Sequence, residues 1–326
     1  MKIAILTDQS RASFLPSEEA MQEDNQKLET VKELKNILSK KYDCISLIAD
    51  DNIISTLRNE NVDLVFNLCN GLNGDSKLSQ IPAMLEFAGI PYTASSVIGH
   101  TLASNKFYSS KLFKSNDVYT PDFIAINKIS ELENIDLQFP ILIKPNDEGS
   151  SRGIHQDSLV NTKEELFDGV KKALELYQPP ILLNEYIVGR EFSVGVIGNG
   201  KDIEVLPIQE VDLSNLPDNL EKFYSFEVKT YYKEYTTYHI PAKLSNEEEL
   251  LIKNACIKAY NTLNLKDYAR VDVILKDNIP YVLEINSLPG LMKNKSALYR
   301  MAESSGQGYE NFVLQIVDTA KLRYNL

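Results

Sequence analysis

Four polar side chains, paired on two neighbouring segments, carry the first chemical signal in this sequence. Arg270 and Asp272 stand two residues apart in a stretch rich in Val and Ile, and Glu284 and Asn286 stand two apart in the next such stretch. Asp277–Asn278 lie between the stretches, so the pattern predicts a β-hairpin. Because side chains alternate between the faces of a strand, each pair shares a face. Folding the hairpin at the turn places Asp272 nearly opposite Glu284.

Two carboxylates directly opposite each other in a ladder repel, so this hairpin requires a positive charge between them. Arg270 alone can supply that charge. The two carboxylates together with the carboxamide of Asn286 also make an all-oxygen set, which suits a hard cation such as Mg²⁺. The alternative interpretation is a solvated hairpin whose rungs are simply charged.

A glycine- and serine-containing loop at Gly149–Gly153 is a candidate phosphate cradle, because glycines let successive backbone N–H groups turn toward one anion. Taken alone, the loop is more typical of a plain β-turn. Lys144 ends the apolar strand before it, and a buried lysine needs an anionic partner. Lys106, Lys229 and Arg270 are the further cations that could complete a set around a triphosphate.

The segment Asn184–Glu191 covers the end of a predicted strand and the tight connection that follows it. Free backbone N–H and C=O groups at such a strand end can pair with a ligand, and Glu191 can accept hydrogen bonds from a pair of ribose hydroxyls. The alternative is a domain linker with ordinary surface charges.

Alternation of strand and helix in residues 1–100 predicts an α/β domain that begins with a strand at Lys2–Leu6. Val62–Leu68 is a near-continuous apolar run, as expected for a parallel strand covered on both faces. The loop that follows, at 69–75, lies at the carboxyl end of that strand, where ligands gather in open α/β sheets.

Two further units follow, which we place at 101–186 and 187–326, giving a three-domain α/β protein. In the second we expect a continuous helix over Leu102–Phe113. In the third we expect strands at Glu191–Ile197 and Ile203–Gln209, joined by a glycine-rich turn.

Composition limits the partners of the chain. The net charge is −12, which argues against nucleic acid and anionic membranes. The sequence has no apolar run of 18 residues, and the apolar stretch in Met1–Asp8 is too short for a signal peptide. Three scattered cysteines without metal-ligand spacing suggest free thiols in a reducing compartment, so we expect a cytoplasmic protein.

The ordered set of motifs resembles the ATP-grasp superfamily and, within it, the D-alanine–D-alanine ligases, from the first strand to about Leu298. The segment Phe223–Lys229 also resembles the ω-loop with which that family closes over its nucleotide. The matching motifs in chain order are Lys106; Lys144-Pro145 with Glu148-Gly149-Ser150-Ser151; Gly189-Arg190-Glu191; Arg270-Val271-Asp272; and Glu284-Ile285-Asn286-Ser287-Leu288-Pro289-Gly290.

This resemblance implies a ligase in which ATP phosphorylates a carboxylate and an amine then attacks the acylphosphate. It implies two Mg²⁺ ions, with Mn²⁺ as a possible substitute, small amino acid or amine substrates, and a homodimer. The implied metal ligands are Asp272, Glu284 and Asn286. The residues implied to bind the phosphates are Lys106, Lys144, Ser150, Ser151 and Lys229. Those implied at the adenine and ribose are Asn184, Glu185, Ile187 and Glu191. Those implied to be catalytic are Arg270, Gly290, Ser150 and Lys229, of which Arg270 and the Gly290 N–H form an oxyanion hole.

Departures from the family concentrate in the amino-acid pocket. The glutamate-bearing motif after the first strand is missing at Thr7–Arg11, and Asn70-Gly71 replaces a His-Gly pair. Thr230 replaces the ω-loop tyrosine, and Lys295 occupies the position of a serine that binds the substrate carboxylate, with Ser296 one residue late. Glu18, Glu19 and Glu23 are the candidates for the missing glutamate.

The sequence therefore predicts a dipeptide or amino-acid ligase with an altered substrate pocket. A cell-wall D-alanine–D-alanine ligase is the second interpretation, and an ATP-binding regulator without turnover is the third. A dinucleotide-dependent dehydrogenase is excluded, because Thr7–Phe14 lacks the glycines that such a fold needs.

Overall fold

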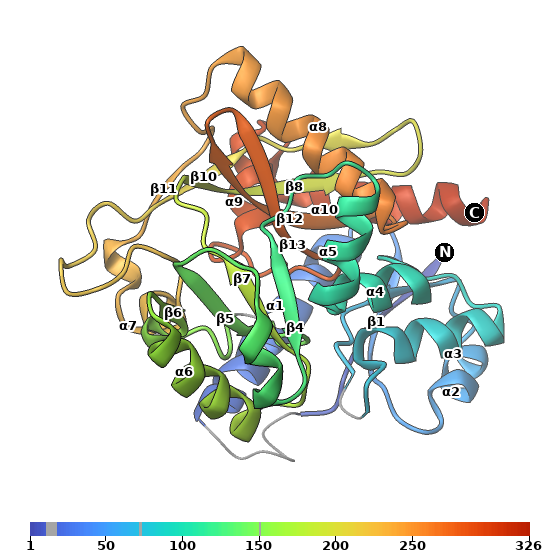
Figure 1. Cartoon of the computed structure of the whole chain (residues 1–326). Helices are drawn as coiled ribbons and strands as arrows, with labels where there is room; N and C mark the ends of the chain where they lie inside the picture. Colours follow the sequence, from blue (N-terminus) through green and yellow to red (C-terminus); the bar gives the residue numbers. More distant parts are fainter. Residues whose placement is uncertain (11–17, 72–73, 150) are drawn as a thin grey trace.

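In the residues that it describes, the computed structural model contains three β-sheets, which follow one another along the chain, with helices packed around them (Figure 1). It describes residues 1–10, 18–71, 74–149 and 151–326. Within these residues no helix is both long and apolar enough to cross a membrane. The division into domains at residues 100 and 186 stays a prediction.

The first sheet has three parallel strands in the order β2-β1-β3, and β1 lies in the centre. Its apolar strands are covered on one side by α1 and on the other by α2 and α3, as predicted for a parallel sheet. The elements are β1 (Lys2–Thr7), α1 (Glu18–Leu38), β2 (Asp43–Ile48), α2 (Ile53–Asn59), β3 (Leu64–Asn67) and α3 (Gln80–Ala88).

The second sheet is antiparallel with the order β4-β7-β5-β6, and α6 packs on it. Thr162 caps α6 by accepting a hydrogen bond from the Glu165 N–H at 3.2 Å, while the Glu165 side chain accepts from the Asn161 N–H. The elements are β4 (Phe123–Ile126), β5 (Ile141–Pro145), β6 (Leu159–Val160), α6 (Lys163–Leu176) and β7 (Ile181–Glu185).

The continuous helix expected over Leu102–Phe113 is wrong. The chain forms two helices instead, α4 (Val97–Ser104) and α5 (Lys106–Ser115). Asn105 between them is extended, with φ of −108° and ψ of 101°, and its side chain accepts from the N–H of Tyr108. An asparagine competes with the helical backbone for hydrogen bonds and favours the N-cap position. The break makes Lys106 the first residue of α5.

The third sheet has the strand order β11-β10-β8-β12-β13, with β9 paired to β8. The prediction of a strand at Ile203–Gln209 is wrong. Only Glu204–Val205 form a strand that pairs with β8. Pro207 has no N–H to donate to a ladder, and the next strand begins beyond it. The elements are β8 (Arg190–Ile197), β9 (Glu204–Val205), β10 (Gln209–Asp212), α7 (Phe226–Tyr231), β11 (Thr237–His239), α8 (Asn246–Thr262), β12 (Tyr268–Lys276), β13 (Ile279–Asn286), α9 (Ala297–Ser304) and α10 (Gly308–Tyr324).

Two cores pack other parts of the chain against the third sheet. The end of the chain returns to the beginning, since Phe312 and Ile316 of α10 pack with Ile5 and Leu34 in one core. On the other side, Phe113 of α5 packs into the core between α8 and the third sheet. These contacts hold α5, which begins with Lys106, directly beside the predicted hairpin.

Candidate active site

A β-bulge brings the two carboxylates of the hairpin together. The tight turn has φ of +50° at Asp277 and +60° at Asn278, as expected for a two-residue hairpin loop. Without a bulge, such a turn would pair Asp272 with Leu283. The register shifts beyond Val273, and Asp272 pairs with Glu284 instead. The predicted pairing is confirmed, and the extra residue in β13 is its cause.

Hydrogen bonds keep the two carboxylates from facing each other unshielded. Arg270 donates two hydrogen bonds to Asp272, from Nε to Oδ1 at 2.9 Å and from Nη2 to Oδ2 at 2.7 Å. The Asn286 amide donates to Asp272 Oδ2 at 3.2 Å and to Glu284 Oε1 at 3.3 Å. Ser193 of β8 donates to Asp272 Oδ1 at 2.8 Å. The predicted metal ligands and Arg270 therefore form one connected cluster.

Two buried lysines reach this cluster from other elements. Lys106 Nζ lies 3.5 Å from Glu284 Oε2 and donates to the Glu148 carbonyl. Lys144, in β5 of the second sheet, is only 7% exposed. Burial and the neighbouring charge of Lys106 lower the pKa of Lys144 to about 8. Burial alone would raise the pKa of Glu284, but Lys106, Lys144 and Arg270 outweigh it and hold that pKa below its ordinary value.

The donor set fits a divalent cation that shares its ligands with a polyanion. Asp272 and Glu284 supply carboxylate oxygens, and a half-turn of the Asn286 amide would present its oxygen. Within the described part of the chain, no group of three or more His, Cys, Asp or Glu side chains forms an all-protein metal cage. Mg²⁺ is commonly bound by one or two carboxylates plus substrate phosphates, and the two lysines provide the charge for such phosphates.

The predicted lid loop and ω-loop lie against each other. Ser151 Oγ donates to the Tyr224 carbonyl at 3.2 Å. Just beyond the lid loop, His155 Nδ1 lies 2.8 Å from Glu227 Oε1, and Glu227 belongs to α7 of the ω-loop. Ser150 lies outside the described residues. The contacts couple the position of the lid to that of α7.

Lys229 lies in the last turn of α7 and is half-buried. Ser225 caps this short helix by accepting from the Val228 N–H at 3.2 Å, and its hydroxyl also accepts from Gln156 Nε2 at 2.9 Å. Thr230 beside Lys229 is exposed.

The residues predicted to contact the nucleoside lie where the second sheet passes into the third. Asn184 and Glu185 end β7, and Ile187 is buried in the connection to β8. The Asn184 Oδ1 atom is buried and accepts no hydrogen bond within the described structure. Burial and the charge of Asp272 raise the pKa of Glu191 to about 8.

Gly290 is exposed in the loop after β13, with open space around its Cα. Lys295 further along this loop is also exposed. Ser296 is the N-cap of α9, where its hydroxyl accepts from the Tyr299 N–H at 3.2 Å. It therefore already has a structural role in the fold.

At the carboxyl end of β1, Asp8 is buried and accepts from the backbone N–H groups of Asn70 and Gly71, at 2.6 and 3.0 Å. Lys27 of α1 lies 3.2 Å from the same carboxylate. The side chains of the candidate glutamates Glu18, Glu19 and Glu23 lie outside what the structure describes. Asp8 therefore anchors the 70–71 loop at the place where the sequence predicts substrate binding.

Sequence reasoning missed several residues around the cluster. A row of side chains runs across the third sheet from β10 to β13, because Gln209 pairs with Ser193, Ser193 with Asp272, and Asp272 with Glu284. The alternation of Glu191 and Ser193 in an otherwise apolar β8 was a usable signal for this row. The remaining missed residues, from separate segments, are Tyr224, Tyr238 and Arg300.

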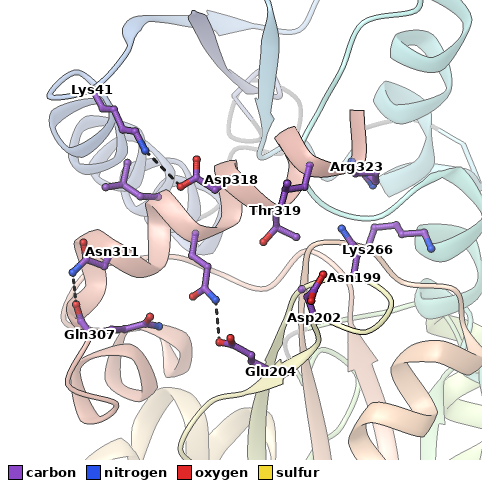
Figure 2. Close-up of a pocket in the computed structure, with 14 residues that line it drawn as sticks. Lys41, Asn199, Asp202, Glu204, Lys266, Gln307, Asn311, Asp318, Thr319 and Arg323 are labelled. Atoms are coloured by element: carbon purple, nitrogen blue, oxygen red, sulfur yellow. Dashed lines mark hydrogen bonds and ion pairs between the residues drawn. The ribbon is translucent and has the colours of Figure 1, made fainter. Parts of the chain in front are cut away.

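A cavity of about 720 Å³ lies among α10, the loop after α1 and the β8–β9 turn (Figure 2). None of its lining residues belongs to the predicted site. Its walls carry three positively and three negatively charged side chains, among them Lys41, which lies 3.5 Å from Asp318. The cavity therefore offers little unbalanced charge to a ligand.

Comparisons with known proteins agree with this geometry. A family profile described as D-ala D-ala ligase C-terminus matches residues 112–318. The uncharacterized protein y4sG of Sinorhizobium fredii is 36% identical over 80% of this chain and 75% of its own length. A D-alanine–D-alanine ligase of Carboxydothermus hydrogenoformans is 32% identical over 86% of this chain and 88% of its own. The solved D-alanine–D-alanine ligase of Bacillus anthracis complexed with ATP shares the fold, with a TM-score of 0.75, 24% identity and coverage of 99% and 98%.

The three sheets and the lysine–carboxylate cluster define an ATP-grasp enzyme, an ADP-forming, ATP-dependent carboxylate–amine ligase that uses Mg²⁺. The chain belongs to the D-alanine–D-alanine ligase family. The predicted fold class and reaction class are thereby confirmed.

Proposed function

We propose that this ligase joins two amino acids, or an amino acid and an amine, with a specificity other than D-alanine for D-alanine. The observation that carries the proposal is a contrast within one site. The cluster of Asp272, Glu284, Lys106 and Lys144 has the charges and contacts that phosphoryl transfer needs. The substrate end instead has an exposed Lys295 and a buried, already bonded Asp8.

In the proposed first step, the γ-phosphoryl group of ATP passes to a carboxylate oxygen of the first substrate, giving an acylphosphate and ADP. Lys106 and Lys144 hold the α- and β-phosphates, and Lys229 holds the γ-phosphate. Mg²⁺ bound by Asp272, Glu284 and Asn286 would neutralise charge on the phosphates. Asn184, Glu185 and Ile187 contact the adenine, and Glu191 binds the ribose.

In the second step, the amine nitrogen attacks the acyl carbon, phosphate leaves, and the nitrogen loses a proton to give an amide. Arg270 and the Gly290 N–H face the oxyanion that develops on the acyl oxygen. Ser150 and Ser151 belong to the lid that keeps water away from the acylphosphate. The contacts of Ser151 and His155 with the ω-loop support a lid that closes together with α7.

The family relationship and the free cysteines Cys44, Cys69 and Cys256 support a cytoplasmic enzyme, and we propose a homodimer on the family resemblance alone. The D-alanine–D-alanine ligase reaction is the second candidate, since relatives of comparable length carry that name.

The test is ATP-dependent phosphate release across a matrix of D- and L-amino acids and small amines, with mass spectrometry of the products. Release with another acid–amine pair and not with D-alanine supports the proposal. Release with D-alanine alone assigns the second candidate. ATP binding without phosphate release for any pair would contradict both and indicate a regulator.

A further inference from the structure

Helix α9 lies on the face of the third sheet that carries the active site. Gly195 pairs with Arg270 across β8 and β12, so both positions point to the same face. A Cβ at Gly195 would lie 2.8 Å from Leu298 Cδ2 and 3.1 Å from Met301 Sδ, both in α9. Because position 195 has no side chain, α9 can pack closely on this face of the sheet, which also carries Arg270.

Arg300 of α9 is held in a fixed position there. Its Nε donates to Gln209 Oε1 at 2.8 Å and its Nη1 to the Lys295 carbonyl at 2.6 Å. Its Cζ lies 4.2 Å from the ring centroid of Tyr238. Gln209 is 1% exposed and is the first member of the row that leads to the carboxylates. Arg300 is thus held by three contacts, one of them to the buried amide of Gln209, and is itself half-buried.

The charge of Arg300 is not balanced by a carboxylate in the described part of the chain. Other guanidinium groups have one, such as Arg190 with Glu210 at 2.8 Å and Arg270 with Asp272 at 2.7 Å. The polar partners of Arg300 are a neutral amide, a carbonyl and an aromatic ring. A partly desolvated cation without a counter-ion is costly, and a ligand anion would offset that cost.

The position of Arg300 separates this anion from the phosphates of ATP. Gln209 stands at the β10 end of the row, whereas Glu284 and its two lysines stand at the β13 end. Neighbouring strands are about 4.8 Å apart, so three strand spacings put the two ends about 14 Å from each other. Arg270 lies between them, and the proposed oxyanion lies beside it. An anion at Arg300 therefore belongs to the substrate on the side away from the phosphates.

On the basis of the proposed ligase reaction, we propose that Arg300 is a specificity-determining residue that binds the carboxylate of the amine substrate. The nucleophile is then an amino acid and not a carboxylate-free amine. The stack on Tyr238 and the bond to Gln209 leave Nη2 of the fork for a carboxylate oxygen. Tyr238, whose hydroxyl lies 3.0 Å from that of Tyr224, forms the wall beside it.

The experiment compares each amino acid of the substrate matrix with its carboxamide, in the wild type and in Arg300→Met. Methionine keeps an unbranched apolar stem in place of the arginine stem and removes the charge. We expect the wild type to prefer the carboxylate form and Arg300→Met to raise the KM for it by about 10- to 100-fold, the range for a lost charged hydrogen bond. The KM for ATP stays within about twofold of the wild-type value, because the lysine cluster is intact. Arg300→Lys should retain part of the preference. Arg58→Met, at an exposed arginine of α2, is the matched control.

Two results would overturn the assignment. One is a wild-type enzyme that uses carboxamides or simple amines as well as amino acids, and the other is an unchanged preference in Arg300→Met. If no pair gives phosphate release, the proposed function fails, and thermal unfolding with Mg²⁺, ADP and each amino acid tests Arg300 separately. An amino-acid-dependent rise in Tm that Arg300→Met abolishes supports the carboxylate site. No such rise in the wild type would refute it.

Discussion

Replacement of Arg270 by alanine is the sharpest test of the proposed second step. Arg270 forms an ion pair with Asp272, one of the two opposed carboxylates of the hairpin, and it is also the proposed oxyanion donor. Its guanidinium donates from Nε and Nη2 to Asp272. No described residue accepts a hydrogen bond from Nη1, so one nitrogen of the fork is available to a substrate oxygen.

The expected magnitude follows from that single nitrogen. Loss of one oxyanion donor lowers kcat by about 10²–10³, and we expect this loss for Arg270→Ala. Asp272 also loses its paired hydrogen bonds and keeps those from Ser193 and Asn286. Its side chain is 13% exposed, so we expect the free energy of unfolding without Mg²⁺ to fall by about 2 kcal/mol. Arg270→Lys keeps the charge but not the fork and should fall between alanine and wild type.

The assay is steady-state ADP release with the productive substrate pair, together with thermal unfolding with and without Mg²⁺ and ATP. Lys276→Ala, at an exposed position on the same strand, should leave both measurements unchanged. A loss of kcat below tenfold for Arg270→Ala would remove Arg270 from the oxyanion role. If extra Mg²⁺ restores kcat in full, the substitution acts only through Asp272.

Three further changes have defined outcomes. Lys144 has a pKa of about 8, and ATP favours its protonated form, so the affinity for ATP should be constant below pH 8 and fall about tenfold per pH unit above it. Calorimetric titration with ATP from pH 7 to 10 should show this fall in the wild type and not in Lys144→Arg. A constant affinity in the wild type would refute the role of Lys144. His155→Phe removes the 2.8 Å contact with Glu227 and should raise the KM for ATP about three- to tenfold in steady-state assays, whereas an unchanged KM would uncouple the lid from α7. Gly195→Ala places a methyl group against two side chains of α9 and should lower the free energy of unfolding, measured by urea titration, by about 1–3 kcal/mol. A variant as stable as the wild type, or more stable, would show that α9 can move away.

Much of the fold could be predicted from the local pattern of the sequence. Alternating polar and apolar residues and the Asp277–Asn278 turn identified the hairpin, because strand period and turn conformation depend on neighbours in the chain. The same kind of reasoning failed at Asn105 and Pro207. At both, a single residue ended an element that the apolar pattern would have continued, through a capping hydrogen bond in one case and a missing N–H in the other.

The sequence by itself determined which residues carry the chemistry of phosphoryl transfer, since Lys144, Asp272 and Glu284 stand in motifs with recognisable spacing. Only the tertiary structure decided how the site is assembled. The bulge beyond Val273 sets the face on which Glu284 lies, and α9 brings Arg300 to the sheet face that carries Arg270. Both depend on hydrogen bonds and packing between segments distant in the chain, and such long-range contacts leave no period in the local sequence.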